Sequence, residues 1–313
     1  MKVLVTGGAG FIGSNLTERL VRDGHEVLVI DNLASGKEEN LAAIRKNITF
    51  HKETINNDMK KMLGGVEVVF HLAALPRVQF SIHNPIESHH ANINGSLNLL
   101  KQCADSGIKR FIFSSSSSVY GDQDSLPLKE TMKPNPMSPY ALQKLTIEHY
   151  SKLFHEVYGL KTISLRYFNV YGPKQDKESN YSNLIPKFIG LIQKDEQPKI
   201  YGDGTQTRDF TYVEDVVSAN IVSMKSNNKK IFGEVFNIGS GNRISVNEIA
   251  ENISKLLYSK TKPIYADPII EPKHTLADVS KAKNLLDWQP NTSISVGLKK
   301  TIEHSKSLKS NNS

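Results

Sequence analysis

A tyrosine and a lysine stand four residues apart in the segment Ser138-Pro139-Tyr140-Ala141-Leu142-Gln143-Lys144. On a helix this spacing puts both side chains on one face, and Pro139 suits the first turn of such a helix. A phenol with a pKa of about 10 is a poor base at neutral pH. A neighbouring ammonium favours the phenolate and lowers that pKa. The pair therefore predicts proton transfer by Tyr140, tuned by Lys144.

A run of hydroxyl side chains, Ser114-Ser115-Ser116-Ser117-Ser118, follows the strand-like residues 110–113. Ligands of doubly wound sheets bind at the carboxyl ends of the strands. A hydroxyl at this place can bind a substrate oxygen that loses its proton. A serine-rich loop without chemistry is the alternative, but the order and spacing of this run, Tyr140 and Lys144 favour one shared site.

Three glycines, Gly7, Gly10 and Gly13, follow the apolar residues 3–5 and lead into an amphipathic segment at 14–21. Gly7 permits a tight turn, Gly10 lets a pyrophosphate approach the backbone, and Gly13 lets the helix pack close to the sheet. The helix N-terminus then faces the phosphates. The pattern predicts a dinucleotide site, with a purely structural strand-turn-helix as the alternative.

A second apolar run, at residues 26–30, ends in Asp31, where a dinucleotide fold places the acid that binds the adenosine ribose. A carboxylate repels a 2′-phosphate by roughly 4 kcal/mol at about 4 Å and an effective dielectric near 20. Because no arginine follows directly, the sequence predicts NAD rather than NADP. A bound oxidised nicotinamide would be a second positive charge that favours the Tyr140 phenolate.

The elements that must position these residues alternate through the first half of the chain. Strand-like runs lie at 3–5, 27–30, 48–51, 66–72, 111–114 and 162–165, with amphipathic stretches such as 92–104 and 140–158 between them. This alternation predicts an α/β fold, a Rossmann-type doubly wound parallel sheet with right-handed crossovers. Past Arg166, prolines punctuate a smaller, mixed α/β substrate-binding region with strands at 199–201 and 235–238 and helices at 246–257 and 280–286.

The expected organisation is an NAD-binding domain over residues 1–170, a substrate-binding region over 171–305 and a frayed tail over 306–313. A segment near 210–240 is expected to return to the first domain.

The amino-acid composition limits the classes of function that this chain can have. The chain has 313 residues, one cysteine and a formal net charge of +7. The single Cys103 excludes internal disulfides and thiolate clusters and suits a reducing compartment, the cytoplasm. No apolar run is long enough to span a bilayer, and no signal peptide is expected. Scattered lysines without interleaved aromatic residues argue against nucleic acid, and the histidines lack metal-ligand spacing, so no metal is expected.

Taken together, the motifs of this chain resemble the extended short-chain dehydrogenases/reductases. Within that group they are most similar to the UDP-hexose 4-epimerases acting on UDP-glucose or UDP-N-acetylglucosamine. The motifs are Gly-Gly-Ala-Gly-Phe-Ile-Gly at 7–13, His71-Leu72-Ala73-Ala74, Ser116 before Val119-Tyr120-Gly121, Tyr140-x-x-x-Lys144 and Arg166-Tyr167-Phe168-Asn169. The resemblance runs from Met1 to Trp288-Gln289-Pro290.

The resemblance implies site residues. Tyr140 is the base and acid, Lys144 tunes it and holds the nicotinamide ribose, and Ser116 binds the reacting oxygen. Implied NAD contacts are Gly7, Gly10, Phe11, Ile12, Gly13, Asp31, Asn32, Ser35, Gly36, Thr54, Ile55, Leu72, Ala73, Ala74, Asn92, Ser114, Tyr140, Lys144, Tyr167 and Val170. Implied UDP-sugar contacts are Ser116, Tyr140, Asn169, Asn183, Leu184, Tyr201, Arg208, Lys273 and Thr275. A homodimer through the helices at 92–104 and 140–158 is also implied.

The triplet Ser116-Ser117-Ser118 separates related reactions. The 4,6-dehydratases place Asp and Glu after the first hydroxyl, and UDP-glucuronate decarboxylases place Glu at the position of Ser118. Without a second acid, the simplest chemistry is reversible hydride transfer, which inverts C4 of a UDP-hexose through a 4-keto intermediate. A nucleotide-sugar 4-reductase, dehydrogenase or dehydratase of the same fold is the alternative. A catalytically silent nucleotide-binding scaffold is the non-enzymatic alternative.

Two segments depart from the family pattern. The family usually has Arg-Pro-Gly-Asp where this chain has Pro268-Ile269-Ile270-Glu271, so the loop arginine on the diphosphate is absent. Lys273 is expected to supply charge there as a point donor. Where a Gly-Asp pair usually lies beside the adenine, this chain has Glu53-Thr54-Ile55, and Thr54 can still hydrogen-bond.

Two positions bear on the substrate. Arg208 is expected to form a bidentate pair with a phosphate, with a surface ion pair to Asp209 or Asp203 as its alternative. Thr275 stands where the epimerases restricted to glucose carry a bulky residue. Its small side chain predicts that UDP-GlcNAc and UDP-GalNAc fit besides UDP-glucose and UDP-galactose.

Overall fold

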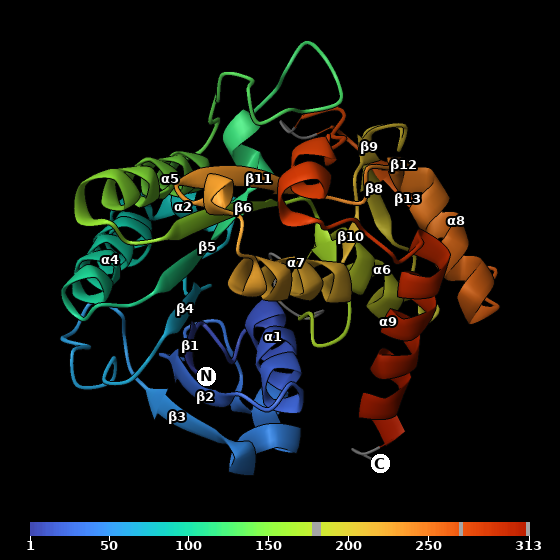
Figure 1. Cartoon of the computed structure of the whole chain (residues 1–313). Coiled ribbons are helices and arrows are strands. Elements are labelled where there is room, and N and C mark those ends of the chain that lie inside the picture. The colour runs from blue at the N-terminus through green and yellow to red at the C-terminus, as the bar shows by residue number, and fades with distance from the viewer. Residues whose placement is uncertain (177–182, 269–271, 311–313) are drawn as a thin grey trace.

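A parallel sheet lies at the centre of the computed structural model, which describes residues 1–176, 183–268 and 272–310, with side chains through 307. Its strands run in the order β11-β6-β5-β4-β1-β2-β3 (Figure 1). They are β1 (Lys2–Thr6), β2 (Glu26–Asp31), β3 (Ile48–Lys52), β4 (Val68–His71), β5 (Arg110–Ser116), β6 (Thr162–Tyr167) and β11 (Glu234–Ile238). The strand order reverses between β1 and β4, which confirms the predicted Rossmann-type doubly wound sheet.

Helices cover both faces of this sheet. On one face α1 (Phe11–Arg22) contacts α7 (Val213–Lys225), and on the other α4 (Gly95–Asp105) contacts α5 (Pro139–Tyr158) (Figure 1). Successive strand side chains point to opposite faces, so each strand contributes to two cores. In β1, for example, Val3 and Val5 pack in the cluster that contains α1 and α7, whereas Leu4 packs in the cluster that contains α4 and α5.

The second half of the chain forms smaller elements. Short strands pair as β10 (Thr211–Tyr212) with β7 (Val170–Tyr171), β12 (Ile244–Ser245) with β9 (Thr207–Arg208), and β13 (Ile264–Ala266) with β8 (Lys199–Tyr201). Besides α7, its α-helices are α6 (Leu184–Ile192), α8 (Val246–Leu257) and α9 (Ile294–Ser310). The remaining helical pieces are α2 (Val78–His83), α3 (Pro85–His89), the 3-10 segments η1 (Glu38–Asn47), η3 (Ser117–Tyr120) and η4 (Lys229–Ile231), and the π-helical segments η2 (His90–Asn94) and η5 (Ala282–Leu286).

Several elements differ from the sequence-based expectation. The helix expected over 92–104 begins as α4 at Gly95, because the π-helical η2 precedes it, and the helix expected over 280–286 is largely the π-helical η5. The tail expected to fray from residue 306 continues α9 to Ser310. Buried Leu298 and Ile302 anchor this helix. The domain boundaries stay a prediction, although β11 does pair with β6 of the central sheet.

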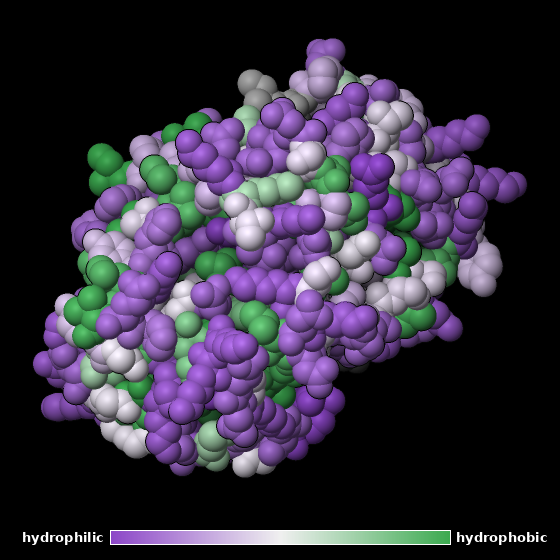
Figure 2. Space-filling model, turned by 45° about the horizontal axis from the view of Figure 1, so that its top comes forward, coloured by the Kyte–Doolittle hydropathy of each residue, from purple (hydrophilic) through white to green (hydrophobic). Residues whose placement is uncertain are grey.

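The surface is mostly hydrophilic on the face shown in Figure 2, where hydrophobic residues form separated patches. No helix within the described ranges is long and apolar enough to cross a membrane.

Candidate active site

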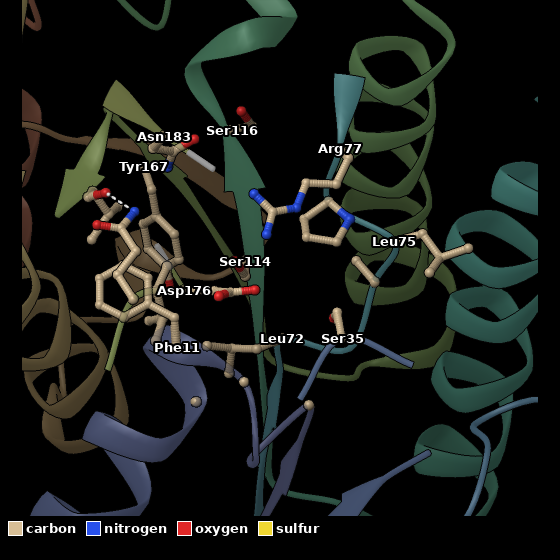
Figure 3. Close-up of a pocket in the computed structure, with 18 of the residues that line it drawn as sticks. Phe11, Ser35, Leu72, Leu75, Arg77, Ser114, Ser116, Tyr167, Asp176 and Asn183 are labelled. Carbon is tan, nitrogen blue, oxygen red and sulfur yellow. Dashed lines mark hydrogen bonds between the residues drawn. The ribbon is translucent and has the colours of Figure 1, made fainter. Parts of the chain in front are cut away.

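A large cleft opens where the carboxyl ends of β1, β2, β4, β5 and β6 meet loops from the second half of the chain. Its volume is about 1970 Å³, which exceeds the roughly 300–1,000 Å³ of an ordinary small-molecule pocket. Figure 3 shows part of its lining, with Phe11 and Ser35 near one end and Asn183 and Ser116 near the other. The cleft has room for a dinucleotide and a second ligand together.

The glycine turn after β1 needs glycine for two physical reasons. Gly7 has φ +71° and its N–H donates to Ile30 O at 2.8 Å, which ties the turn to β2. A Cβ on Gly13 would lie 2.1 Å from Gly7 O. Helix α1 can therefore begin directly beside the strand end only because Gly13 has no side chain. The turn leaves a cradle that a diphosphate fits, at the N-terminus of a 12-residue helix.

Asp31 stands at the end of β2 and is only 6% exposed. Its Oδ2 accepts a hydrogen bond from Ala9 N at 2.9 Å, and its Oδ1 accepts one from Leu33 N at 2.8 Å. Burial raises the pKa of this carboxyl, and the backbone donors counteract the rise. Asp31 lines the cleft, and a carboxylate can accept more than two hydrogen bonds, so it is held where it can accept from ribose hydroxyls.

Tyr140 is placed by the first turn of α5. The Ser138 hydroxyl caps this helix by accepting from Ala141 N at 3.2 Å, and Pro139 occupies the first helical position. The backbone N–H of Tyr140 donates to Ser81 Oγ at 3.1 Å, which ties α5 to α2. The Tyr140 side chain is buried yet lines the cleft, where it hydrogen-bonds Ser116.

Lys144 follows Tyr140 by one helical turn, as the sequence predicts. Its Nζ donates to Ser114 O at 2.7 Å and lies 5.8 Å from the centre of the Tyr140 ring. Burial lowers the pKa of Lys144 to about 7, and the Glu148 carboxylate one turn further on opposes this fall. The ammonium is therefore held at the end of β5, in reach of a ligand in the cleft.

The electrostatics of Tyr140 differ from the sequence-based expectation. Burial dominates and raises the pKa of Tyr140 to about 12. Two groups oppose this rise, the Ser116 hydrogen bond and the positive charge of Arg77. That Lys144 lowers this pKa stays a prediction; its Nζ donates to Ser114 O and lies 5.8 Å from the centre of the Tyr140 ring.

Side chains from the second half of the chain close the other end of the cleft. Asn169 has φ +28°, and its Nδ2 donates to Asp209 O at 3.2 Å and Thr275 Oγ1 at 3.4 Å. Arg208 Nη1 donates to Lys273 O at 3.0 Å, so the backbone of Lys273 positions the arginine. Three segments far apart in sequence thus form one wall with Arg208 and Thr275 in the lining.

Most of the predicted site residues line this one cleft, and four do not. Gly36 lies behind the lining, where a Cβ would meet Asp31 Oδ2 at 2.8 Å. Asn92 is buried, and its side chain binds the backbone of Leu75 instead. Leu184 packs against the core, and the side chain of Lys273 is exposed. Of the departing loop, residues 269–271 lie outside the described residues.

Two charged residues outside the predicted set, Arg77 and Asp176, also line the cleft (Figure 3). Arg77 follows the strand-end motif His71-Leu72-Ala73-Ala74 by three residues, so its position after β4 is a signal that the sequence carries. Asp176 follows β7, which has two residues and leaves no periodicity to detect.

The other reactive residue types have structural roles. His71 is fully buried, with Nδ1 2.8 Å from Thr6 Oγ1 and Nε2 2.8 Å from Ser96 Oγ. Burial lowers its pKa to about 3, so this histidine is neutral. Cys103 is buried in the core, and burial raises the pKa of its thiol. In the described part of the chain, no group of three His, Cys, Asp or Glu residues is arranged to hold a metal.

Comparison with known proteins gives consistent matches over nearly the whole chain. Residues 3–239 match the model of a family described as NAD dependent epimerase/dehydratase family. A UDP-N-acetylglucosamine 4-epimerase from Methanobrevibacter ruminantium M1, solved with UDP-N-acetylmuramic acid, is 43% identical with a TM-score of 0.94, covering 98% of each chain.

Two further solved structures differ from that protein in the sugar they act on. The UDP-glucose 4-epimerase of Thermotoga maritima, solved with UDP-glucose, is 38% identical with a TM-score of 0.94, covering 98% of this chain and 99% of that one. The UDP-glucuronic acid 4-epimerase of Bacillus cereus, solved with UDP-glucuronic acid and NAD, is 35% identical with a TM-score of 0.92. The match covers 98% of this chain and 100% of that one.

Proposed function

The chain belongs to the NAD dependent epimerase/dehydratase family, and from that membership we propose that it is a UDP-sugar 4-epimerase, an isomerase that inverts C4 with NAD. One observation carries the proposal: Tyr140, Ser116 and Lys144 line the same cleft as the glycine turn and Asp31. Solved relatives that match 98% of this chain are 4-epimerases of three different UDP-sugars. Neither Ser117 nor Ser118 supplies the second acid that a dehydratase or decarboxylase needs.

The cofactor fits the residues that the cleft presents. The glycine turn would hold the diphosphate, Asp31 the adenosine ribose and Lys144 the nicotinamide ribose. When bound, NAD supplies a reversible hydride acceptor, which is the chemistry that inversion of a carbinol carbon through a ketone needs.

The protein's own part is proton transfer. Tyr140 is hydrogen-bonded to Ser116 at the end of β5. A sugar hydroxyl seated between these two oxygens would lose its proton to the Tyr140 phenolate and regain it after inversion. Ser116 would hold the reacting oxygen through both transfers. Because the same residue acts as base and acid, the reaction needs no further titratable group.

The proposal is tested by incubating the purified protein with UDP-glucose, UDP-glucuronate, UDP-N-acetylglucosamine and a dTDP-sugar, and identifying products by NMR. A C4 epimer should form without net change in the absorbance of reduced nicotinamide. NAD should stay with the protein through gel filtration. Stoichiometric use of reduced nicotinamide would instead indicate a 4-reductase or dehydrogenase, and binding without turnover would indicate a scaffold.

Thr275 is proposed to admit an N-acetyl group. It is 9% exposed, lines the cleft and is hydrogen-bonded to Asp209 N and Asn169 Nδ2. Thr275→Tyr should lower kcat/KM for UDP-GlcNAc by about 10- to 200-fold, because added bulk competes with the acetyl group. UDP-glucose turnover should persist, and Thr275→Ser serves as the control. Equal losses for both substrates would contradict this role.

Arg208 is proposed to bind the diphosphate, supported by its place in the cleft lining and its fixation to Lys273 O. A guanidinium forms a bidentate pair with a phosphate, which a lysine cannot. The charge that the departing loop lacks is thereby assigned to Arg208 rather than to the exposed Lys273.

A homodimer and a cytoplasmic location are also proposed. Leu142, Leu153 and Val157 are 54%, 46% and 64% exposed, and their spacing puts them on one face of α5. Light scattering should give the mass of two chains, and the double variant Leu153→Glu/Val157→Glu should give one chain with unchanged circular dichroism. A monomeric wild type would contradict the dimer. The buried, single thiol Cys103 supports the reducing location.

A further inference from the structure

An arginine projects into the catalytic end of the cleft. Arg77 precedes α2 and is partly buried in the cleft lining. Figure 3 shows its guanidinium pointing into the cleft toward β5, between Ser114 and Ser116. Proton transfer by Tyr140, Ser116 and Lys144 does not require an arginine here, so its placement calls for a separate explanation.

The segment before Arg77 is fixed to the helix that carries Tyr140. Asn92 Oδ1 accepts from Leu75 N at 2.7 Å, and Asn92 Nδ2 donates to Leu75 O at 3.1 Å. The same Nδ2 donates to Gln143 Oε1 on α5 at 2.8 Å, and Ser88 Oγ donates to that oxygen at 2.7 Å. These buried bonds give Leu75 a constant position relative to α5.

The segment after Arg77 is fixed to α5 as well. Ser81 is fully buried, and its Oγ accepts from Tyr140 N at 3.1 Å and donates to Val78 O at 2.6 Å. Arg77 therefore lies between two attachments to α5, one at Leu75 and one at Ser81. Its Cα is held rigidly relative to Tyr140, as a group acting by its charge requires.

The groups that bear directly or indirectly on the charge of Tyr140 come from four segments of the described chain. Lys144, on α5 itself, donates to Ser114 O, with its Nζ 5.8 Å from the centre of the Tyr140 ring. Ser116 contributes a hydrogen bond from β5. Arg77 contributes positive charge from the segment before α2, and Asp176, in the loop after β7, acts on Arg77 with the opposite charge.

We propose that Arg77 is a positioning residue whose fixed positive charge stabilises the phenolate form of Tyr140, and that Asp176 moderates this charge. The proposal rests on the proposed function only for its kinetic readout. Burial raises the pKa of Tyr140 to about 12, and the Ser116 hydrogen bond and the positive charge of Arg77 oppose this rise. Removing the guanidinium therefore makes the base harder to form.

The kinetic test compares Arg77→Gln, Arg77→Lys and Asp176→Asn across pH. Arg77→Gln should move the acidic limb of the kcat profile to higher pH by about one unit, so that kcat below the limb falls about tenfold. Arg77→Lys should retain most of the wild-type profile, because it keeps the charge. Asp176→Asn should move the limb in the opposite direction, since it removes the charge that opposes Arg77.

A second readout does not depend on turnover. The ultraviolet absorbance of tyrosinate, taken as the difference between each protein and its Tyr140→Phe counterpart, reports the ionisation of Tyr140 directly in the protein as purified. Arg77→Gln should raise the pH midpoint of the Tyr140 ionisation, and Arg77→Lys should restore the wild-type midpoint. If the wild type inverts no UDP-sugar but this shift appears, the proposed function fails and the role of Arg77 stands.

Two results would overturn the proposed role of Arg77. If the Arg77→Gln profile overlays that of the wild type while KM alone rises, Arg77 serves substrate binding only and the proposal is overturned. An unchanged tyrosinate midpoint in Arg77→Gln overturns it as well, whatever the kinetics show.

Discussion

Replacing Tyr140 with phenylalanine is expected to lower kcat for C4 inversion by about 100- to 10,000-fold, the usual contribution of a positioned general base and acid. The ring remains, so packing at the start of α5 is kept, and only the hydroxyl that hydrogen-bonds Ser116 is lost. NAD retention and UDP binding should be nearly unchanged, because the glycine turn, Asp31 and Arg208 are assigned most of those contacts. Turnover is measured by NMR with UDP-glucose and UDP-N-acetylglucosamine.

Tyr158→Phe is the matched control on the same helix. Tyr158 is the last residue of α5, is 51% exposed and lies outside the cleft lining. The kcat of the Tyr158→Phe protein should equal that of the wild type. Wild-type turnover in Tyr140→Phe would show that another group moves the proton and would remove the basis of the proposed mechanism.

The second large effect is expected for Gly13→Ala. A Cβ at this position would meet Gly7 O at 2.1 Å and Gly8 Cα at 2.9 Å, which are backbone atoms that no rotamer change can move. Helix α1 must shift away from the strand end, which deforms the cradle for the diphosphate. We expect the protein to lose its NAD and the free energy of unfolding to fall by about 1–3 kcal/mol.

Both quantities are measured on one preparation, NAD by release and assay after gel filtration and stability by denaturant unfolding. Gly64→Ala is the control, since a Cβ there would meet only Lys61 O at 3.4 Å. A Gly13→Ala protein that retains NAD at wild-type stability would mean that α1 tolerates displacement, and the glycine turn would lose its assigned role.

Much of this molecule was predictable from local pattern. Alternating strand and helix periodicity gives the layers, and the glycine spacing with Asp31 after the second strand gives the dinucleotide site, because both depend on residues close in sequence. The four-residue spacing of Tyr140 and Lys144 gives a shared helix face for the same reason. The resulting fold and family predictions are confirmed.

Other properties of the site depend on contacts between segments that are far apart in the sequence. Asn92 was expected beside the cofactor, yet in the structure it clamps Leu75 to Gln143, which only the packing of η2 against α5 decides. Lys273 is exposed, and its backbone carbonyl instead positions Arg208. In both cases the residue was identified as part of the site region, but the direction of its side chain depends on contacts that sequence spacing does not encode.

The sequence by itself determined which residue types could do the chemistry: Tyr140, Lys144, Ser116, the glycine turn and Asp31. Only the tertiary structure decided the electrostatics that govern Tyr140. Burial raises the pKa of its phenol, and the Ser116 hydrogen bond and the positive charge of Arg77 oppose this rise. The physical reason is that desolvation and Coulomb interactions depend on distance and burial in space, and neither quantity follows from the order of residues in a chain.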